Sequence, residues 1–317
     1  MRVTVFGATG DQGSAQVRAL VRAGHQPVAV SRAPKAWQVD GVAVETFAGD
    51  YGDIDRLVRA VDGAQAVLLN LPSTSFQIAA PLVAAADAIA AAAARSASTH
   101  VLVFNTSLPV PAHKRGFAAQ DARHEMRRRI MASGVPAISI EPVVFLDNLL
   151  KGWAWPAIAQ EQTLRYAHRA TLDVSWICHD DLAALMLAAM ERPQLAGRCF
   201  AVGGPETVRL PQLAQMLSQA WGRPLRHESQ SVDDFCQRMR QVFEGKATLD
   251  MDRMIGELHR IYTWYNTSLE QPFRVDMAPV LKHLPVRLTP IATWARNQTL
   301  PDTAETATVM PSATVRN

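Results

Sequence analysis

Short apolar runs alternate with helical patterns over roughly the first 140 residues. The apolar runs are typical of buried strands and cover residues 3–6, 27–31, 42–47, 66–69, 100–105 and 137–141. The segments between them repeat apolar positions at helical spacing over residues 12–23, 54–61, 76–97 and 118–133. Gly24, Gly63 and Gly134 follow three of these segments, as glycine commonly does at helix ends. This alternation predicts a doubly wound α/β fold around a parallel sheet.

The pattern changes after Pro142, where longer irregular segments contain several Trp and Pro residues. We expect a smaller C-terminal α/β lobe there, with helices at about 180–191 and 211–221, a returning strand at 198–202, and a helical stretch over 231–265 with a break near Gly245. The predicted division is a sheet domain over residues 1–150, a substrate-binding lobe over 151–298 that is interleaved with the sheet, and a disordered threonine-rich tail over 299–317.

Composition and charge exclude several classes of protein. The chain has 48% hydrophobic and 19% charged residues and a formal net charge of +3, and its densest basic run covers only residues 127–129. Charge therefore gives no indication of direct nucleic-acid binding. Cys178, Cys199 and Cys236 are widely spaced and form no CxxC pair, so we expect neither a disulfide framework nor a metal site.

No segment has the composition of a membrane span. The longest apolar stretch, residues 79–94, is mostly alanine and contains Asp87. It is too short and too weakly hydrophobic to cross a bilayer, and the first strand begins at Arg2 without a signal-peptide pattern. We predict a cytoplasmic protein without membrane association, and the sequence leaves open whether it forms a homodimer.

Three glycines follow the first strand, and they open the first helix. Gly7, Gly10 and Gly13 belong to the sequence Gly-Ala-Thr-Gly-Asp-Gln-Gly, in which Thr9, Asp11 and Gln12 fill the other polar positions. A pyrophosphate must approach backbone N–H groups at a helix start, where side chains would hold it away. A glycine triplet between a strand and a helix therefore predicts a dinucleotide site of the Rossmann type, to which we assign all six of these residues.

The end of the second strand distinguishes NAD from NADP. An acidic residue there would bind the ribose 2′-hydroxyl, whereas an arginine accommodates a 2′-phosphate. The strand ends at Ser31 and is followed by Arg32 and Lys35, with no acidic residue before Asp40. This pattern favours NADPH, although Arg32 could instead be a solvated surface side chain.

Further motifs, taken in order along the chain, resemble the NmrA-like branch of the atypical short-chain dehydrogenases. The resemblance covers residues 1 to about 297 and depends on the glycine loop, Arg32, residues 48–51, 70–72, 106–107, 133–135 and 141–148, and Trp294 after 288–290. The family includes quinone, enone and aromatic ether reductases, and also redox-sensing regulators without catalysis.

The resemblance also implies roles for individual residues. It implies an adenine contact at Asp50 and Tyr51, and a cofactor wall at Leu71 and Pro72. It further implies a nicotinamide pocket near four residues, which are Thr106, Ser107, Pro142 and Phe145.

The chain departs from most short-chain dehydrogenases at the proton donor. Those enzymes use a tyrosine with a lysine four residues later, but none of the tyrosines at 51, 166, 262 and 265 has such a lysine. The NmrA-like family often has a lysine or histidine on the helix after the fifth main strand, about where Arg123 and His124 stand. Arginine cannot donate a proton at neutral pH, whereas His124 can, unless it belongs to a solvated helix face. Ser107 could polarise a carbonyl or bond its own backbone.

Aromatic residues after Pro142 could provide a flat apolar surface for a substrate or simply fill a core, and they are Phe145, Trp153, Trp155, Tyr166 and Trp176. Our first hypothesis is a reductase that uses NADPH to transfer hydride directly to a small aromatic or conjugated carbonyl, quinone or enone. The alternatives are a non-catalytic NADP(H)-sensing regulator and, less favoured, redox-neutral chemistry with a bound cofactor.

Overall fold

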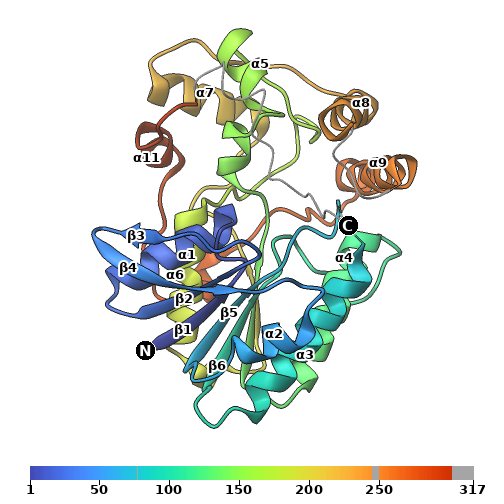
Figure 1. The fold of residues 1–317 in the computed structure, drawn as a ribbon. Coiled ribbons are helices and arrows are strands. Elements are labelled where there is room, and N and C mark those ends of the chain that lie inside the picture. Colours follow the sequence, from blue (N-terminus) through green and yellow to red (C-terminus); the bar gives the residue numbers. More distant parts are fainter. Residues whose placement is uncertain (77, 245–249, 302–317) are drawn as a thin grey trace.

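The main sheet has eight strands, and its order reverses beside the first one (Figure 1). The computed structural model describes residues 1–76, 78–244 and 250–301. Across the sheet the order is β3-β4-β2-β1-β5-β6-β7-β9. Neighbours are parallel except β3 and β4. The strands are β1 (Arg2–Phe6), β2 (Gln26–Ser31), β3 (Trp37–Val39), β4 (Val42–Ala48), β5 (Ala66–Asn70), β6 (Val101–Asn105), β7 (Ala137–Pro142) and β9 (Cys199–Val202).

The strand register brings the carboxyl ends of the central strands together. Phe6 of β1 lies opposite Val30 of β2 and Leu69 of β5, and Asn70 of β5 lies opposite Asn105 of β6. The loops after β1 and β5 lead to helices on opposite faces of the sheet. They therefore leave a crevice between them at the point where the strand order reverses. Parallel α/β sheets bind their ligands in such a crevice.

Helices cover both faces of the sheet (Figure 1). One face packs Val3 and Val5 of β1 against α1 (Asp11–Arg22), α6 (His179–Met190) and α10 (Met277–His283). The other face packs Phe6 and Leu69 against α2 (Ile54–Arg59), α3 (Ala79–Arg95) and α4 (Ala118–Ala132). Burial on both faces explains why the central strands are almost entirely apolar.

The C-terminal lobe lies over the carboxyl edge of the sheet (Figure 1). It contains a two-stranded parallel sheet of β8 (Thr163–Leu164) and β10 (Arg226–His227). Its helices are η1 (Leu146–Leu150), α5 (Trp155–Gln160), α7 (Leu210–Trp221), α8 (Val232–Phe243), α9 (Met251–Thr267) and α11 (Ile291–Arg296). A short helix, η2 (Pro193–Leu195), joins α6 to β9, so the chain returns to the main sheet between parts of the lobe.

The predicted fold class is confirmed, and the strands that were not predicted are β3 in the main sheet and β8 and β10 in the lobe. The expected strands and helices all form within a few residues of their predicted bounds, apart from the break near Gly245, which lies outside the described residues. Sequence analysis assigned no strand to residues 37–39, which form β3. Asp40 and Gly41 both have left-handed backbones, with φ of 51° and 80°. Two such residues form the tight turn that pairs β3 with β4 as a hairpin.

Part of the predicted tail contacts the lobe. The indole Nε1 of Trp155 donates a hydrogen bond to the carbonyl oxygen of Pro301 at 2.8 Å, and Leu300 packs against the same apolar cluster as Trp155. The remainder of the predicted disordered tail, residues 302–317, lies outside the described residues. Within the part of the chain that the structure describes, no helix is long and apolar enough to cross a membrane.

A histidine is buried in the aromatic interior of the lobe. We call His168 and the rings around it the aromatic cluster, whose other members are Tyr166, Trp176, Tyr262, Tyr265 and Phe273. The ring centroids of these residues lie 4.7–6.4 Å from that of His168, whose exposed fraction is 2%. Burial among apolar rings disfavours the charged imidazole and lowers the pKa of His168 to about 3.

Because His168 is buried, we predict that the protein loses stability in mild acid. Between the ordinary histidine pKa of ~6.5 and the folded value, only the unfolded chain binds this proton, so the free energy of unfolding falls as the pH falls. The expected loss from His168 alone at pH 5 is about 2 kcal/mol. Urea unfolding at pH 7 and pH 5 should show a smaller pH difference in His168→Phe than in wild type. Replacing the exposed His113 by Asn should leave this difference in unfolding free energy unchanged. An equal difference in all three proteins would contradict the lowered pKa of His168.

Candidate dinucleotide-binding site

The glycine loop presents backbone N–H groups at the start of α1. Gly7 directly follows β1 and has a left-handed backbone (φ 67°), and its carbonyl oxygen accepts a hydrogen bond from the N–H of Gly10 at 3.1 Å. Gly10 is the residue before α1 and offers no side-chain cap to the helix. The first N–H groups of a helix lack partners within the helix, so this end of α1 can bind an anion.

The three glycines of the loop differ in what an added side chain would contact. A Cβ atom at Gly13 would lie 2.2 Å from the carbonyl oxygen of Gly7, and one at Gly7 would lie 2.8 Å from that of Asn70. These two positions therefore require glycine for packing inside the protein. At Gly10, which is exposed, the nearest atom to an added Cβ is the Gly7 oxygen at 3.3 Å. A side chain at Gly10 would thus extend to the surface at the start of α1.

Four amide side chains join the glycine loop to the ends of β5 and β6. Gln16 and Asn70 exchange two hydrogen bonds of 2.8 Å, and Asn70 Nδ2 also donates to the carbonyl oxygen of Phe6 at 3.0 Å. Asn105 Nδ2 donates to Asn70 Oδ1 at 2.8 Å and to Gln12 Oε1 at 2.6 Å. We call Gln12, Gln16, Asn70 and Asn105 the amide network. It fixes the loop after β1 and the start of α1 relative to the ends of β5 and β6.

Ser107 is attached to the same network. Its hydroxyl donates to Gln12 Oε1 at 3.0 Å, and its backbone N–H donates to Asn105 Oδ1 at 2.9 Å. Ser107 has a left-handed backbone with φ of 60°, which is uncommon outside glycine and clusters at functional sites. Beside it, Thr106 is buried and its hydroxyl donates to the carbonyl oxygen of Leu108. The structure therefore places Ser107, one of the predicted nicotinamide-side residues, against Gln12 of the predicted phosphate loop.

Residues predicted to contact the adenosine half of the cofactor gather beside β2. Arg32 directly follows β2 and is exposed, as is Lys35. Arg32 and Asp50 are both close enough to Tyr51 to affect its pKa, which burial raises above its ordinary value. The Tyr51 hydroxyl donates to the backbone oxygen of Asn70 at 2.8 Å. The predicted adenine and 2′-phosphate contacts thus lie at the same edge as the glycine loop.

A buried arginine supports the predicted cofactor wall. Arg123 on α4 is fully buried, and its Nη2 donates to the backbone oxygens of Leu71 at 3.0 Å and Pro72 at 2.6 Å. Among the described residues, no carboxylate forms an ion pair with Arg123. Burial lowers the pKa of its guanidinium to about 10. The cation instead fixes two successive carbonyl groups of the loop after β5.

The other side of the predicted nicotinamide pocket is formed by residues after β7. Pro142 ends β7, and Phe145 is buried and forms an isolated bridge to Ile177. The Phe145 ring lies 4.7 Å from that of His179, whose pKa burial lowers. An ion pair of 2.7 Å connects Asp11, the first residue of α1, to Lys151 just after η1. The chain after β7 therefore approaches the start of α1.

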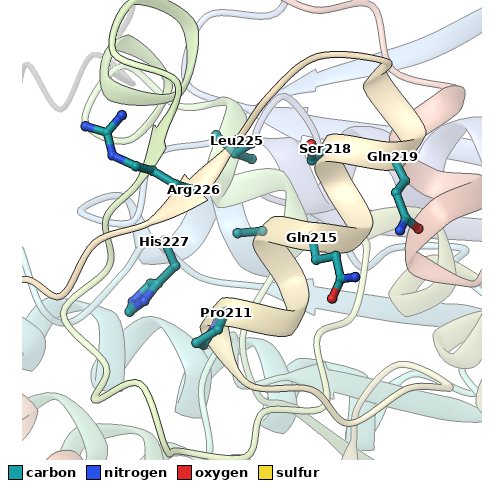
Figure 2. Close-up of a pocket in the computed structure, with 8 residues that line it drawn as sticks. Pro211, Gln215, Ser218, Gln219, Leu225, Arg226 and His227 are labelled. Carbon is teal, nitrogen blue, oxygen red and sulfur yellow. The ribbon is translucent and has the colours of Figure 1, made fainter.

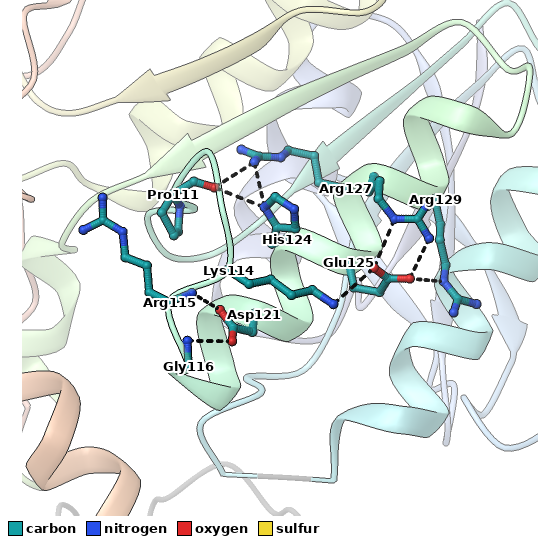
Figure 3. A network of polar contacts seen from close by, with 10 residues as sticks. Pro111, Lys114, Arg115, Gly116, Asp121, His124, Glu125, Arg127 and Arg129 are labelled. Carbon is teal, nitrogen blue, oxygen red and sulfur yellow. Dashed lines mark hydrogen bonds and ion pairs between the residues drawn. The ribbon is translucent and has the colours of Figure 1, made fainter.

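His124 on α4 is half-buried and faces the loop that precedes the helix (Figure 3). Its Nδ1 lies 3.2 Å from the backbone oxygen of Pro111 and 3.3 Å from Nη2 of Arg127. Arg127 also donates to Glu141 at 2.9 Å. The imidazole is thus held against the loop that precedes α4. Its predicted part in proton transfer stays a prediction, as does the predicted part of Ser107 in polarising a carbonyl.

Two residues that contact each other across α4 and α9 were not predicted from the sequence. Gln120 on α4 is buried, and its Nε2 donates to the hydroxyl of Tyr265 on α9 at 3.1 Å. Arg123 was considered only as a proton donor and rejected. The helical spacing of Gln120, Arg123, Met126 and Ile130, all buried, marks the inward face of α4 and was the available signal. Nothing local in the sequence indicates the contact with Tyr265.

A separate hollow lies in the lobe between α7 and β10 (Figure 2). Its volume is about 420 Å³, and its lining residues all come from the lobe: Pro211, Ala214, Gln215, Ser218, Gln219, Leu225, Arg226 and His227. None of the residues predicted from the sequence belongs to it. Over the described ranges, no group of His, Cys, Asp and Glu side chains is arranged to hold a metal ion.

Comparison with known families and proteins agrees with the architecture. The model of the NmrA-like family matches residues 1–284. A (4-alkanoyl-5-oxo-2,5-dihydrofuran-3-yl)methyl phosphate reductase of Streptomyces griseus is 33% identical over 236 residues, which are 73% of this chain and 78% of the relative. An NAD(P)H azoreductase of Xenophilus azovorans is 28% identical over 245 residues, which are 75% of this chain and 80% of the relative.

Solved structures with little sequence identity share the fold. A triphenylmethane reductase of Citrobacter complexed with NADP(H) has a TM-score of 0.69 at 16% identity, covering 93% of this chain and 99% of the other. An NADPH-dependent quinone oxidoreductase of Escherichia coli complexed with NADPH has a TM-score of 0.69 at 17% identity, covering 92% and 98%. The negative transcriptional regulator NmrA in complex with NAD has a TM-score of 0.70 at 16% identity, covering 93% and 94%.

The loop geometry predicts different outcomes for two glycine substitutions. Gly10→Val should leave the melting temperature nearly unchanged but weaken dinucleotide binding roughly a hundredfold, because its side chain enters the space of the pyrophosphate. Gly13→Val should lower stability by about 1–3 kcal/mol or more, because its Cβ overlaps the Gly7 backbone. Calorimetric unfolding and cofactor titration of both variants provide the measurement. Tight NADPH binding by a folded Gly10→Val protein would show that the loop does not hold a pyrophosphate.

Arg123 should affect cofactor binding through the loop that it fixes. Arg123→Met keeps an unbranched side chain but leaves the oxygens of Leu71 and Pro72 without this donor, at a cost of about 1–3 kcal/mol. We expect reduced stability, weaker dinucleotide binding and faster amide exchange around residues 71–74. Arg128→Met, on the exposed face of the same helix, is the matched control. Unchanged exchange in a folded Arg123→Met protein would contradict a positioning role.

Proposed function

Because the chain belongs to the NmrA-like family, we propose that it is an NADPH-dependent reductase that transfers hydride directly to a small aromatic or conjugated acceptor. The acceptor class comprises enones, quinones and related activated carbonyls. The observation that carries this proposal is the amide network, because it joins the anion-binding start of α1 to Ser107 at the end of β6. Such a connection suits a ligand that spans from a phosphate site to a reaction site.

The residues at this edge fit NADPH along its length. The exposed Gly10 and the N–H groups that follow it suit the pyrophosphate, and Arg32 suits the 2′-phosphate. Tyr51 would lie beside the adenine, and Leu71 with Pro72 would form the wall that Arg123 supports. The nicotinamide, when bound near Thr106, Pro142 and Phe145, would supply the hydride.

The relatives support a conjugated acceptor. The Streptomyces griseus relative is named for reduction of an acylated dihydrofuranone phosphate, and the Xenophilus azovorans relative for reduction of azo compounds. Both names describe π systems that can spread the electron pair of an incoming hydride. Such acceptors need less help from a strong acid than an isolated carbonyl does, which suits a chain without a Tyr-Lys pair. To polarise the acceptor oxygen, the Ser107 hydroxyl would turn away from Gln12 Oε1, and His124 would assist proton transfer where an alkoxide forms.

A cofactor-sensing role without catalysis is the second candidate. The missing Tyr-Lys pair favours it, and the regulator NmrA shares the fold. In this case binding of NADP(H) would change affinity for another molecule without hydride transfer. The two candidates differ in one observable, the acceptor-dependent oxidation of bound NADPH.

The test combines acceptor-dependent turnover with cofactor preference. Purified protein should oxidise NADPH in the presence of menadione or an acylated butenolide. It should also bind NADPH at least about tenfold more tightly than NADH, a difference of about 1.4 kcal/mol. Arg32→Ala should remove the preference by weakening NADPH binding, whereas Arg56→Ala, an exposed arginine on α2, should not. Tight NADPH binding without oxidation by any enone, quinone or aromatic aldehyde would favour the sensor instead.

A further inference from the structure

Three deeply buried polar atoms border the aromatic cluster and have no hydrogen-bond partner in the described structure. They are Oε1 of Gln120, Nδ1 of His168 and Nε1 of Trp176. The exposed fractions of these residues are 3%, 2% and 1%. Buried polar groups in folded proteins are nearly always paired, so three unpaired ones in a single cluster require an explanation. A ligand with hydrogen-bonding atoms would satisfy them.

Gln120 and His168 are neighbours of Tyr265, and Trp176 is a neighbour of His168. Gln120 donates to the Tyr265 hydroxyl at 3.1 Å, and the His168 ring lies 6.3 Å from the Tyr265 ring. The Trp176 ring lies 6.4 Å from that of His168. The contributing segments, α4, α9 and the chain after β8, are distant in sequence. Only the folded lobe brings these polar groups together.

The cluster is connected to elements on both sides of the proposed cofactor site. On one side, Gln120 lies one helical turn before Arg123, which binds the backbone of Leu71 and Pro72. On the other side, Tyr166 of the cluster accepts a hydrogen bond of 3.4 Å from Asn148, which lies three residues after Phe145 in η1. Figure 1 shows α9 above α4, over the carboxyl edge of the sheet.

The hydrogen bond between Gln120 and Tyr265 leaves a donor available. Because the Tyr265 oxygen accepts from Gln120 Nε2, its own proton can be donated elsewhere. Burial raises the pKa of Tyr265, so the hydroxyl remains protonated. The unpaired Gln120 Oε1 offers an acceptor beside that donor. The flat rings around them suit a planar molecule.

We propose that the Tyr265 hydroxyl, positioned by Gln120, forms the subsite that binds the oxygen of a planar conjugated acceptor. This inference depends on the proposed reductase function and names the residues that recognise its substrate. Hydride addition to the β-carbon of an enone breaks the C=C π bond and places the electron pair on the enolate oxygen. The Tyr265 O–H donates a hydrogen bond to that oxygen and thereby stabilises the charge as it forms. Water then supplies the proton that converts the enolate to the saturated ketone.

The test removes one hydroxyl and retains the ring. Tyr265→Phe should lower kcat/KM for an enone roughly ten- to a hundredfold and should leave the Kd for NADPH within about twofold. Tyr262→Phe is the matched control, because it removes a hydroxyl from the same cluster and has no hydrogen bond to Gln120. Gln120→Met provides a second variant should Tyr265→Phe fold poorly. Melting temperatures monitor the fold of all three variants.

A binding measurement separates this inference from the proposed function. Quenching of tryptophan fluorescence by 1,4-naphthoquinone, without NADPH, reports acceptor binding near Trp153 and Trp176. A loss of quenching affinity in Tyr265→Phe, but not in Tyr262→Phe, would support the subsite even if wild type oxidised no NADPH. Equal kcat/KM and equal quenching in wild type and Tyr265→Phe would overturn the subsite, while turnover by wild type would leave the reductase function intact.

Discussion

Everything at the carboxyl edge of the sheet depends on the buried hydrogen bonds of the amide network. Gln16 and Asn70 satisfy each other, and Asn105 joins them to Gln12 and so to the glycine loop. Buried amides are costly when unpaired, so each of these side chains constrains the next. The loop after β1 consequently has one position relative to β5 and β6. That position points the start of α1 toward the crevice and brings Ser107 to the loop.

The lobe depends on the same edge through α9. Glu257 accepts a hydrogen bond from the N–H of Ala118 at the start of α4, and Arg260 donates to the carbonyl oxygen of Gly116. Together with the bond between Gln120 and Tyr265, these contacts seat the lobe on the N-terminal end of α4. Because Arg123 on the same helix supports the loop after β5, α4 connects the two halves of the proposed site. The proposed cofactor and acceptor sites therefore share one supporting helix.

Features that depend on local chemistry could be predicted from the sequence, whereas contacts between distant segments could not. Apolar periodicity and the glycine triplet were enough for the doubly wound sheet and the start of α1. The different reasons for Gly10 and Gly13 could not be predicted, because they depend on the distance of each from the Gly7 oxygen. Arg123 has the appearance of a charged surface residue on a polar helix until its burial is known. The contact between Gln120 and Tyr265 spans 145 residues, and no local pattern encodes it.

A crystal structure with NADPH bound tests the central claim most directly. The account predicts a pyrophosphate against the backbone N–H groups of residues 9–13, with Gly10 facing it and the 2′-phosphate beside Arg32. It also predicts a nicotinamide near Ser107 and Phe145, with the amide bonds between Gln16, Asn70 and Asn105 unchanged. A cofactor bound away from the start of α1, or a rearranged amide network around a bound cofactor, would contradict it.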